Sequence, residues 1–96
     1  MEEIKIDDKI YKYKIIKDDS NAFNKEELEN KITDYFIPFD YILGDYAGKN
    51  LRLKGFNKKG NKRFNKYNDY SKIDEYIKNY CNYNSKYFLL EKESNN

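Results

Sequence analysis

Apolar and charged residues alternate along the N-terminal segment of the chain. Ile4 and Ile6 are flanked by charged residues, and residues 9–16 alternate again after the turn-forming pair Asp7-Asp8. Side chains in a strand point alternately to the two faces of a sheet. This pattern therefore predicts a β-hairpin over residues 3–6 and 9–16.

A first helix is predicted to begin at Asn24, whose side chain suits an N-cap. Glu27 lies three residues further on and completes a capping box. The apolar residues that follow at helical spacing are Leu28, Ile32 and Tyr35. Pro38 ends any helix before it, because proline disfavours helical backbone at the preceding residue.

Two strands are predicted next, over residues 39–43 and 50–56, separated by a turn or bulge at residues 44–48, which contain two glycines. In the second strand Leu51, Leu53 and Gly55 face one way, and Arg52, Lys54 and Phe56 face the other. Residues 57–61 form a turn, and residues 62–67 form either a further short strand or an irregular segment.

A second helix is predicted to begin at Ser71, and Asp74, three residues further on, completes a weaker capping box. Its apolar stripe comprises Ile73, Tyr76, Ile77, Tyr80 and Cys81. Residues 82–85 end this helix, and residues 87–90 are apolar on both faces, as in a central strand. The order ββαββ(β)αβ indicates an α+β fold, a small, mostly antiparallel sheet with two amphipathic helices. Residues 1–92 form one domain and residues 93–96 a polar tail.

Composition narrows the possible functions. The chain has 96 residues, mean hydropathy −1.14 and 38% charged residues, but its 18% aromatic content argues against disorder. It contains no histidine and one cysteine, which excludes histidine-based nucleophile activation and an internal disulfide. No apolar run approaches the ~20 residues of a membrane span, and the acidic N-terminus lacks a secretory signal. We expect a non-enzymatic cytoplasmic protein without a cofactor or a membrane partner.

Positive charge is concentrated between residues 46 and 68, which contain eight cations and no acid. The whole chain carries +2, so the remainder carries −6. The candidate binding residues are Lys49, Arg52, Lys54, Phe56, Lys58, Lys59, Lys62, Arg63 and Lys66. A strand face with Arg52, Lys54 and Phe56 would combine phosphate contacts with base stacking.

The favoured hypothesis is binding of RNA or another nucleic acid through this basic, aromatic-interleaved strand and turn. The alternative is a protein-interaction adaptor that docks the same basic face on an acidic partner in the transcription or translation machinery. A solvated basic edge that prevents aggregation would look the same in sequence. The 17 lysines also partly reflect AT-rich codon usage, which weakens the argument from charge.

Two further motifs could carry chemistry. Asp40 and Asp45 flank Gly44 and could together hold Mg²⁺, although aspartates near turns more often bind nearby backbone. The run from Gly55 to Lys62 has the two glycines of a phosphate-binding loop, but Asn61 stands where lysine is required.

The central and C-terminal motifs resemble those of a known family. Residues 39–46 read FDYILGDY, residues 51–56 read LRLKGF, and the chain closes with YCN at 80–82 and YFLLEK at 87–92. This pattern resembles the YutD-like family of low-GC Gram-positive bacteria, with its YDYIVGDW, LRLKGF and YFVLEK motifs, over about residues 2–92. Tyr46 departs from the family's tryptophan. The resemblance implies a compact cytoplasmic α+β domain, and some members of the family are named transcription modulators.

Overall fold

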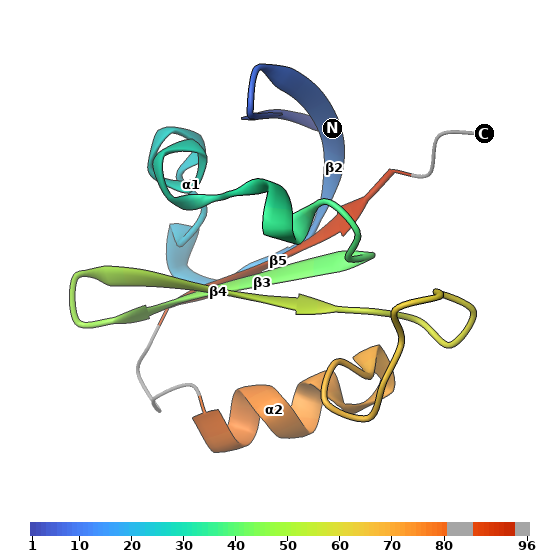
Figure 1. The fold of residues 1–96 in the computed structure, drawn as a ribbon. Coiled ribbons are helices and arrows are strands. Elements are labelled where there is room, and N and C mark those ends of the chain that lie inside the picture. Colours follow the sequence, from blue (N-terminus) through green and yellow to red (C-terminus); the bar gives the residue numbers. More distant parts are fainter. Residues whose placement is uncertain (81–85, 94–96) are drawn as a thin grey trace.

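A curled antiparallel sheet lies between two helices in the computed structural model, which describes residues 1–80 and 86–93 (Figure 1). In chain order its elements are β1 (Glu2–Ile6), β2 (Lys9–Asp18), α1 (Lys25–Lys31), β3 (Tyr41–Ala47), β4 (Asn50–Phe56), α2 (Ile73–Tyr80) and β5 (Tyr87–Lys92). The spatial order of the strands is β1-β2-β5-β3-β4, and each neighbouring pair is antiparallel. The α+β class predicted from the sequence is therefore confirmed.

The predicted N-terminal hairpin is formed. Asp7 and Asp8 make its two-residue turn with φ values of 49° and 67°, which short polar residues tolerate better than most. Tyr13 is fully buried, while Ile10 on the other face is 59% exposed. The strand β2 runs further than predicted, with a bulge between Ile15 and Lys17.

β5 is the central strand that its apolar sequence predicted. Phe88 and Leu90 pack on the α1 side of the sheet, whereas Leu89 packs on the α2 side. Leu28 of α1 and Ile73 of α2 are buried in these two separate clusters. The two helices therefore cover opposite faces of one sheet, as Figure 1 shows.

The predicted turn at residues 44–48 is wrong, because β3 continues through Ala47 and the turn is confined to Gly48 and Lys49. Gly44 is a strand residue that pairs with Phe88 of β5. A Cβ atom at Gly44 would lie 2.2 Å from Cζ of Phe88. This glycine is needed for close packing of an aromatic ring.

The first helix begins as predicted but ends early. The Asn24 side chain accepts a hydrogen bond from the Glu27 backbone N–H at 2.9 Å. Ile32 is already extended, and a short 3₁₀ turn at Asp34–Phe36 redirects the chain toward β3. The helical stripe predicted through Tyr35 is therefore wrong beyond Ile32, and the Tyr35 side chain is 65% exposed.

The second helix is preceded by a 3₁₀ turn at Tyr70–Lys72, whose N-cap is Asp69 and not the predicted Ser71. The Asp69 carboxylate accepts hydrogen bonds from the Ser71 N–H at 3.0 Å and from its Oγ at 2.8 Å, and these bonds lower the pKa of Asp69. Ile73 is buried, but Tyr80 is 64% exposed and does not face the sheet as predicted. Cys81 and the predicted break at 82–85 lie outside the described residues.

No strand forms over residues 62–67, so the optional strand in the predicted order is wrong for this segment. The alternative prediction of an irregular segment over residues 62–67 is confirmed, and an isolated β-bridge between Asn57 and Asp69 closes the loop that contains it. Glu93, the first residue of the predicted tail, donates its N–H to the Lys12 carbonyl, and residues 94–96 lie outside the described residues. No helix in the described part of the chain is long and apolar enough to cross a membrane.

Candidate functional site

The cations of β4 share one face, as predicted, but this face is the one that α2 partly covers. Arg52 and Lys54 alternate with Leu51 and Leu53, which pack on the opposite side of the sheet. The Lys54 amine lies 5.2 Å from the centroid of the Phe56 ring and 5.5 Å from that of Tyr76. Lys54 is therefore half-buried beside aromatic rings, with its charge at the rim of the sheet.

The prediction that Phe56 stacks on bases is wrong. The residue is only 2% exposed and belongs to the core cluster of Ile73 and Leu89. Its ring makes an edge contact with Tyr76 of α2 at a centroid distance of 5.4 Å. The alternation along β4 placed Phe56 on the correct face, but the sequence does not reveal that α2 packs on that face.

Arg52 is occupied by an internal partner. Its guanidinium binds both carboxylate oxygens of Asp45, with Nε donating to Oδ1 at 3.2 Å and Nη2 forming an ion pair with Oδ2. Asp45 is the cross-strand neighbour of Arg52 and its side chain is only 10% exposed. Nη2 also lies 3.4 Å from the Tyr80 carbonyl oxygen. The charge of Arg52 thus balances a nearly buried carboxylate, while half of its side chain stays exposed, and its assignment as a phosphate contact stays a prediction.

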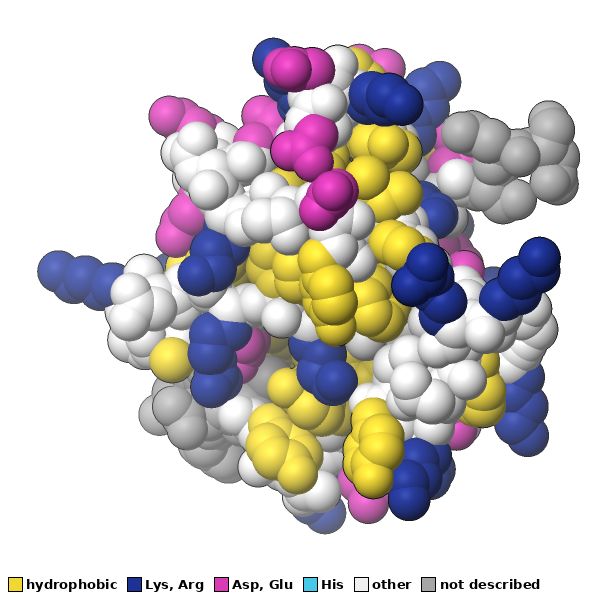
Figure 2. Space-filling model, in the orientation of Figure 1, with side chains coloured by type: hydrophobic (Ala, Val, Ile, Leu, Met, Phe, Trp, Pro, Cys, Tyr) yellow, Lys and Arg dark blue, Asp and Glu magenta, His cyan; other side chains and the backbone are white. Residues whose placement is uncertain are grey.

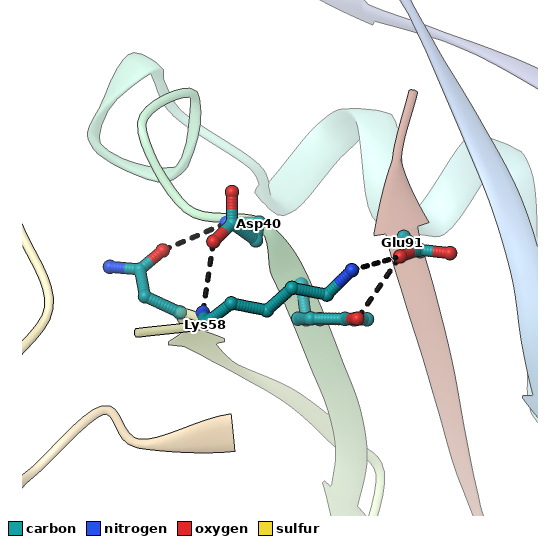
Figure 3. Close-up of polar contacts among 5 residues, drawn as sticks. Asp40, Lys58 and Glu91 are labelled. Atoms are coloured by element: carbon teal, nitrogen blue, oxygen red, sulfur yellow. Dashed lines mark hydrogen bonds and ion pairs between the residues drawn. The ribbon is translucent and has the colours of Figure 1, made fainter. Parts of the chain in front are cut away.

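Lys58 is exposed but also has partners within the domain (Figure 3). Its amine lies 3.3 Å from Oε2 of Glu91, and its backbone N–H donates to Oδ2 of Asp40 at 2.9 Å. The Tyr41 hydroxyl donates to the same Glu91 oxygen at 3.0 Å. Tyr41 and then Glu91 raise the pKa of the Lys58 amine. Lys58 thus anchors the start of the loop to β3 and β5.

Asparagines shape the loop that follows. Oδ1 of the fully buried Asn57 accepts from the Asp40 N–H at 2.9 Å and from Nδ2 of Asn61 at 3.0 Å. Further along, the backbone N–H of Asn65 donates to Oδ1 of Asn68, and the backbone N–H of Asn68 donates to Oδ1 of Asn65. Nδ2 of Asn68 also donates to the Arg63 carbonyl at 2.9 Å. No pattern in the sequence distinguishes these asparagines from those that reflect codon usage. Their role becomes visible only in the folded loop, where their side chains bond residues that are distant in sequence or across the loop.

Side chains on the outside of this loop remain exposed. They are Lys59, Lys62, Arg63 and Lys66. Lys49 is exposed too, but it lies in the β3–β4 turn, at the opposite end of β4. A strand of this length spans about 20 Å. The basic residues therefore form a row along the edge of the sheet with a cluster at one end, and Lys49 is remote from that cluster.

A groove of about 810 Å³ follows the edge of β4. Leu53, Lys54 and Gly55 contribute to its lining from β4, and the opposing sides include Tyr35 and Tyr67. These two tyrosines are 65% and 74% exposed. Figure 2 shows the hollow on this face, with basic and hydrophobic side chains around it.

The exposed tyrosines were missed as site residues. Tyr35 was predicted to lie on a buried helical stripe, and Tyr67 was noted only as an aromatic between cations. Their exposure depends on the 3₁₀ turn after α1 and on the asparagine-braced loop, respectively. Only the interleaving of Tyr67 with basic residues was a usable signal in the sequence.

The structure does not bring Asp40 and Asp45 together as a metal site. Five residues of extended chain separate them by about 16 Å. Asp40 accepts from the Lys58 N–H and Asp45 binds Arg52. Within residues 1–80 and 86–93, no group of three or more acidic or cysteine side chains is arranged to hold a metal ion. Gly60, the second glycine of the loop-like run, has φ of 105° in a turn.

The described fold is an α+β domain with a curled antiparallel sheet covered by one helix on each face. A family model described as "YutD-like: Putative antitoxin YutD-like" matches residues 5–91. The chain belongs to the YutD-like family, as its motifs predicted.

Two individual comparisons agree with this assignment. The chain is 34% identical over 80 residues to a Bacillus subtilis (strain 168) protein named "Putative antitoxin YutD", which covers 83% of this chain and 88% of that protein. The solution NMR structure of yutD from B. subtilis matches with a TM-score of 0.67 at 33% identity, covering 84% of this chain and 74% of the other. The fold is therefore shared with a solved member of the family.

Proposed function

We propose that this domain is a cytoplasmic, non-enzymatic adaptor whose groove along β4 binds an acidic surface of another protein. The observation that carries the proposal is the combination, in one groove, of a sheet edge, two exposed tyrosines and a net positive charge, since three cations and two carboxylates line it. Lys54 and Arg63 both line the groove and, among the described residues, form no ion pair. Tyrosine and arginine are enriched at the energetic centres of protein interfaces.

Two observations favour this adaptor over the nucleic-acid platform that the sequence predicts. A stacking platform needs an exposed ring beside its cations, and Phe56 is buried. Arg52, the arginine of the predicted phosphate-binding face, already binds Asp45. The name "Putative antitoxin", given to the B. subtilis relative, agrees with a role in binding another macromolecule.

Single-stranded RNA remains a second candidate because of one observation. Tyr67 is the most exposed of the groove tyrosines, and the Lys66 amine lies 5.1 Å from its ring centroid. A base could stack on Tyr67 while Lys66 contacts phosphate. This arrangement provides one stacking position, fewer than the row of stacked bases in typical single-strand platforms.

The test is partner capture with charge-reversed variants. The site variant changes Lys62, Arg63 and Lys66 to glutamate, and the matched control changes Lys9, Lys12 and Lys14, which are exposed on the N-terminal hairpin. The proposal predicts that wild type and control enrich the same acidic protein from nuclease-treated lysate and that the site variant does not. Enrichment that disappears with nuclease, or that survives equally in both variants, would contradict it.

A further inference from the structure

The sheet has two edge strands, β1 and β4, and the structure treats them differently. Edge strands expose backbone groups that can pair with another chain, so proteins commonly block them. At β1, the Lys5 N–H donates to Oε2 of Glu29 in α1 at 2.7 Å. The β1 edge is therefore blocked in part by a side chain from the helix packed beside it.

The register of β3 with β4 shows which backbone groups face outward on β4. Ala47 and Asn50 flank a two-residue turn and so exchange both hydrogen bonds. Alternation then directs the backbone N–H and C=O groups of Leu51, Leu53 and Gly55 away from β3. Among residues 1–80 and 86–93, no hydrogen-bond partner occupies these outward groups.

The next outward position on the same side is already paired with an extended segment. The Asn57 N–H donates to the Asn68 carbonyl at 2.7 Å, and the Asn57 carbonyl accepts from the Tyr70 N–H at 3.0 Å. This makes a parallel bridge between Asn57 and Asp69. The line of the β4 edge thus matches the direction of an added strand, and the groove lies beside Leu53 and Gly55. Leu53 is half-buried, whereas Gly55 is buried with the Phe39 ring packed against it, so an added strand would make its first contact at Leu53.

We propose that the β4 edge binds an extended, acidic segment of a partner protein by strand addition, as a sixth strand of the sheet. This inference rests on the proposed adaptor function and specifies how the partner binds. Main-chain hydrogen bonds would provide affinity, and carboxylates of the segment would meet the cations around the groove. Lys54 and Arg63 line the groove, with Asp34 as an acidic group beside them.

Charge also argues against a second copy of this chain as the occupant. Residues 46–68 contain eight cations and no acid. Two β4 strands paired edge to edge would place Arg52 and Lys54 of one copy near the same cations of the other. Like charges opposite each other across strands are destabilising.

The experiment uses the full chain, labelled with ¹⁵N, and an octapeptide that alternates glutamate with valine and threonine. A matched peptide carries N-methyl groups on every internal amide, so neither of its edges can donate strand hydrogen bonds, and its charge is preserved. We expect the unmodified peptide to bind at least about tenfold more tightly, because each lost hydrogen bond weakens binding roughly 2- to 10-fold. We also expect it to slow amide exchange at Leu53 and Gly55.

Protein variants provide the second arm. Leu53→Pro removes one outward N–H without removing a bond to β3, and Leu53→Ala is the control that keeps the N–H. Binding lost in Leu53→Pro and retained in Leu53→Ala, with both variants showing wild-type chemical-shift dispersion, supports strand addition. If Leu53→Pro does not fold, the peptide comparison still decides the question.

The outcomes separate the two proposals. Equal binding of both peptides, weakened by the Lys62, Arg63 and Lys66 reversal, would overturn strand addition and keep the basic adaptor surface. No binding of either peptide would overturn both proposals. Concentration-dependent protection of Leu53 and Gly55 in the protein alone would identify a second copy as the occupant. Binding of an oligouridylate in their place would identify nucleic acid, and either result would contradict the strand-addition proposal.

Discussion

Replacing Arg52 by alanine tests whether this residue is structural or contacts a ligand. The guanidinium binds both oxygens of Asp45, whose side chain is 10% exposed, while the Arg52 side chain is 50% exposed. Removing it leaves a nearly buried carboxylate without its charged partner. Asp45 lies in β3, next to the edge strand β4, directly across from Arg52.

The magnitude follows from the unequal burial of the two partners. Breaking a fully buried ion pair costs about 3–5 kcal/mol. Here the Arg52 side chain is half exposed, so in the variant water can hydrate part of the Asp45 carboxylate in place of the guanidinium. We therefore expect Arg52→Ala to lower the free energy of unfolding by about 1–3 kcal/mol. Each kcal/mol lowers Tm by roughly 4–8 °C in a domain of this size. The Asp45→Asn, Arg52→Ala double variant should recover part of this loss, since no buried charge remains unpaired.

Urea denaturation at neutral pH, followed by circular dichroism, measures the effect, and Lys49→Ala is the matched control. Lys49 is an exposed cation at the end of the same hairpin, so its removal should change stability by no more than about 0.5 kcal/mol. If Arg52→Ala were as stable as Lys49→Ala but lost partner binding, Arg52 would be a ligand contact and the structural assignment would be wrong.

Three other substitutions probe the fold. Gly44→Ala places a Cβ 2.2 Å from the fully buried Phe88 ring and should destabilise the domain by about 1–3 kcal/mol or more in urea titration. Asn57→Ala removes a buried acceptor of two hydrogen bonds and should cost about 1–3 kcal/mol, with faster amide exchange in the 57–69 loop. Tyr13→Phe removes a buried hydroxyl that has no partner among the described residues and should stabilise by about 1 kcal/mol. Burial raises the pKa of the Tyr13 hydroxyl from 10.0 to about 12. The contribution of the neutral hydroxyl to stability is therefore fully present below pH 10 and is lost as the pH rises through 12. Tyr13→Phe has no ionisable hydroxyl at this position, so the fall in its Tm over that pH range should be less steep.

Local patterns predicted the parts of the fold that depend on neighbouring residues. The N-terminal hairpin, the Asn24 cap and the bounds of β4 follow from alternation and capping chemistry within a few positions. The central position of β5 follows from an apolar run without a polar face. The motifs also identified the family, because their characteristic residues span the strands β3, β4 and β5.

The errors concern contacts between segments distant in sequence. Gly44 was interpreted as a turn residue, but an aromatic ring from β5 determines its role. Phe56 and Arg52 were placed on the correct face, but their burial and pairing depend on α2 and on Asp45. The groove and its exposed Tyr67 arise from a loop held by asparagines, and no short pattern predicts that loop.

Photocrosslinking from the groove tests the central claim most directly. Tyr67→p-benzoylphenylalanine places a reactive group on the groove, and Ile10→p-benzoylphenylalanine places one on the N-terminal hairpin at an exposed control position. In cells that express the protein, the account predicts a nuclease-resistant crosslink from position 67, mapped by mass spectrometry to an acidic segment of one protein. The crosslink should be absent from position 10. Crosslinks to RNA, or equal crosslinks from both positions, would contradict it.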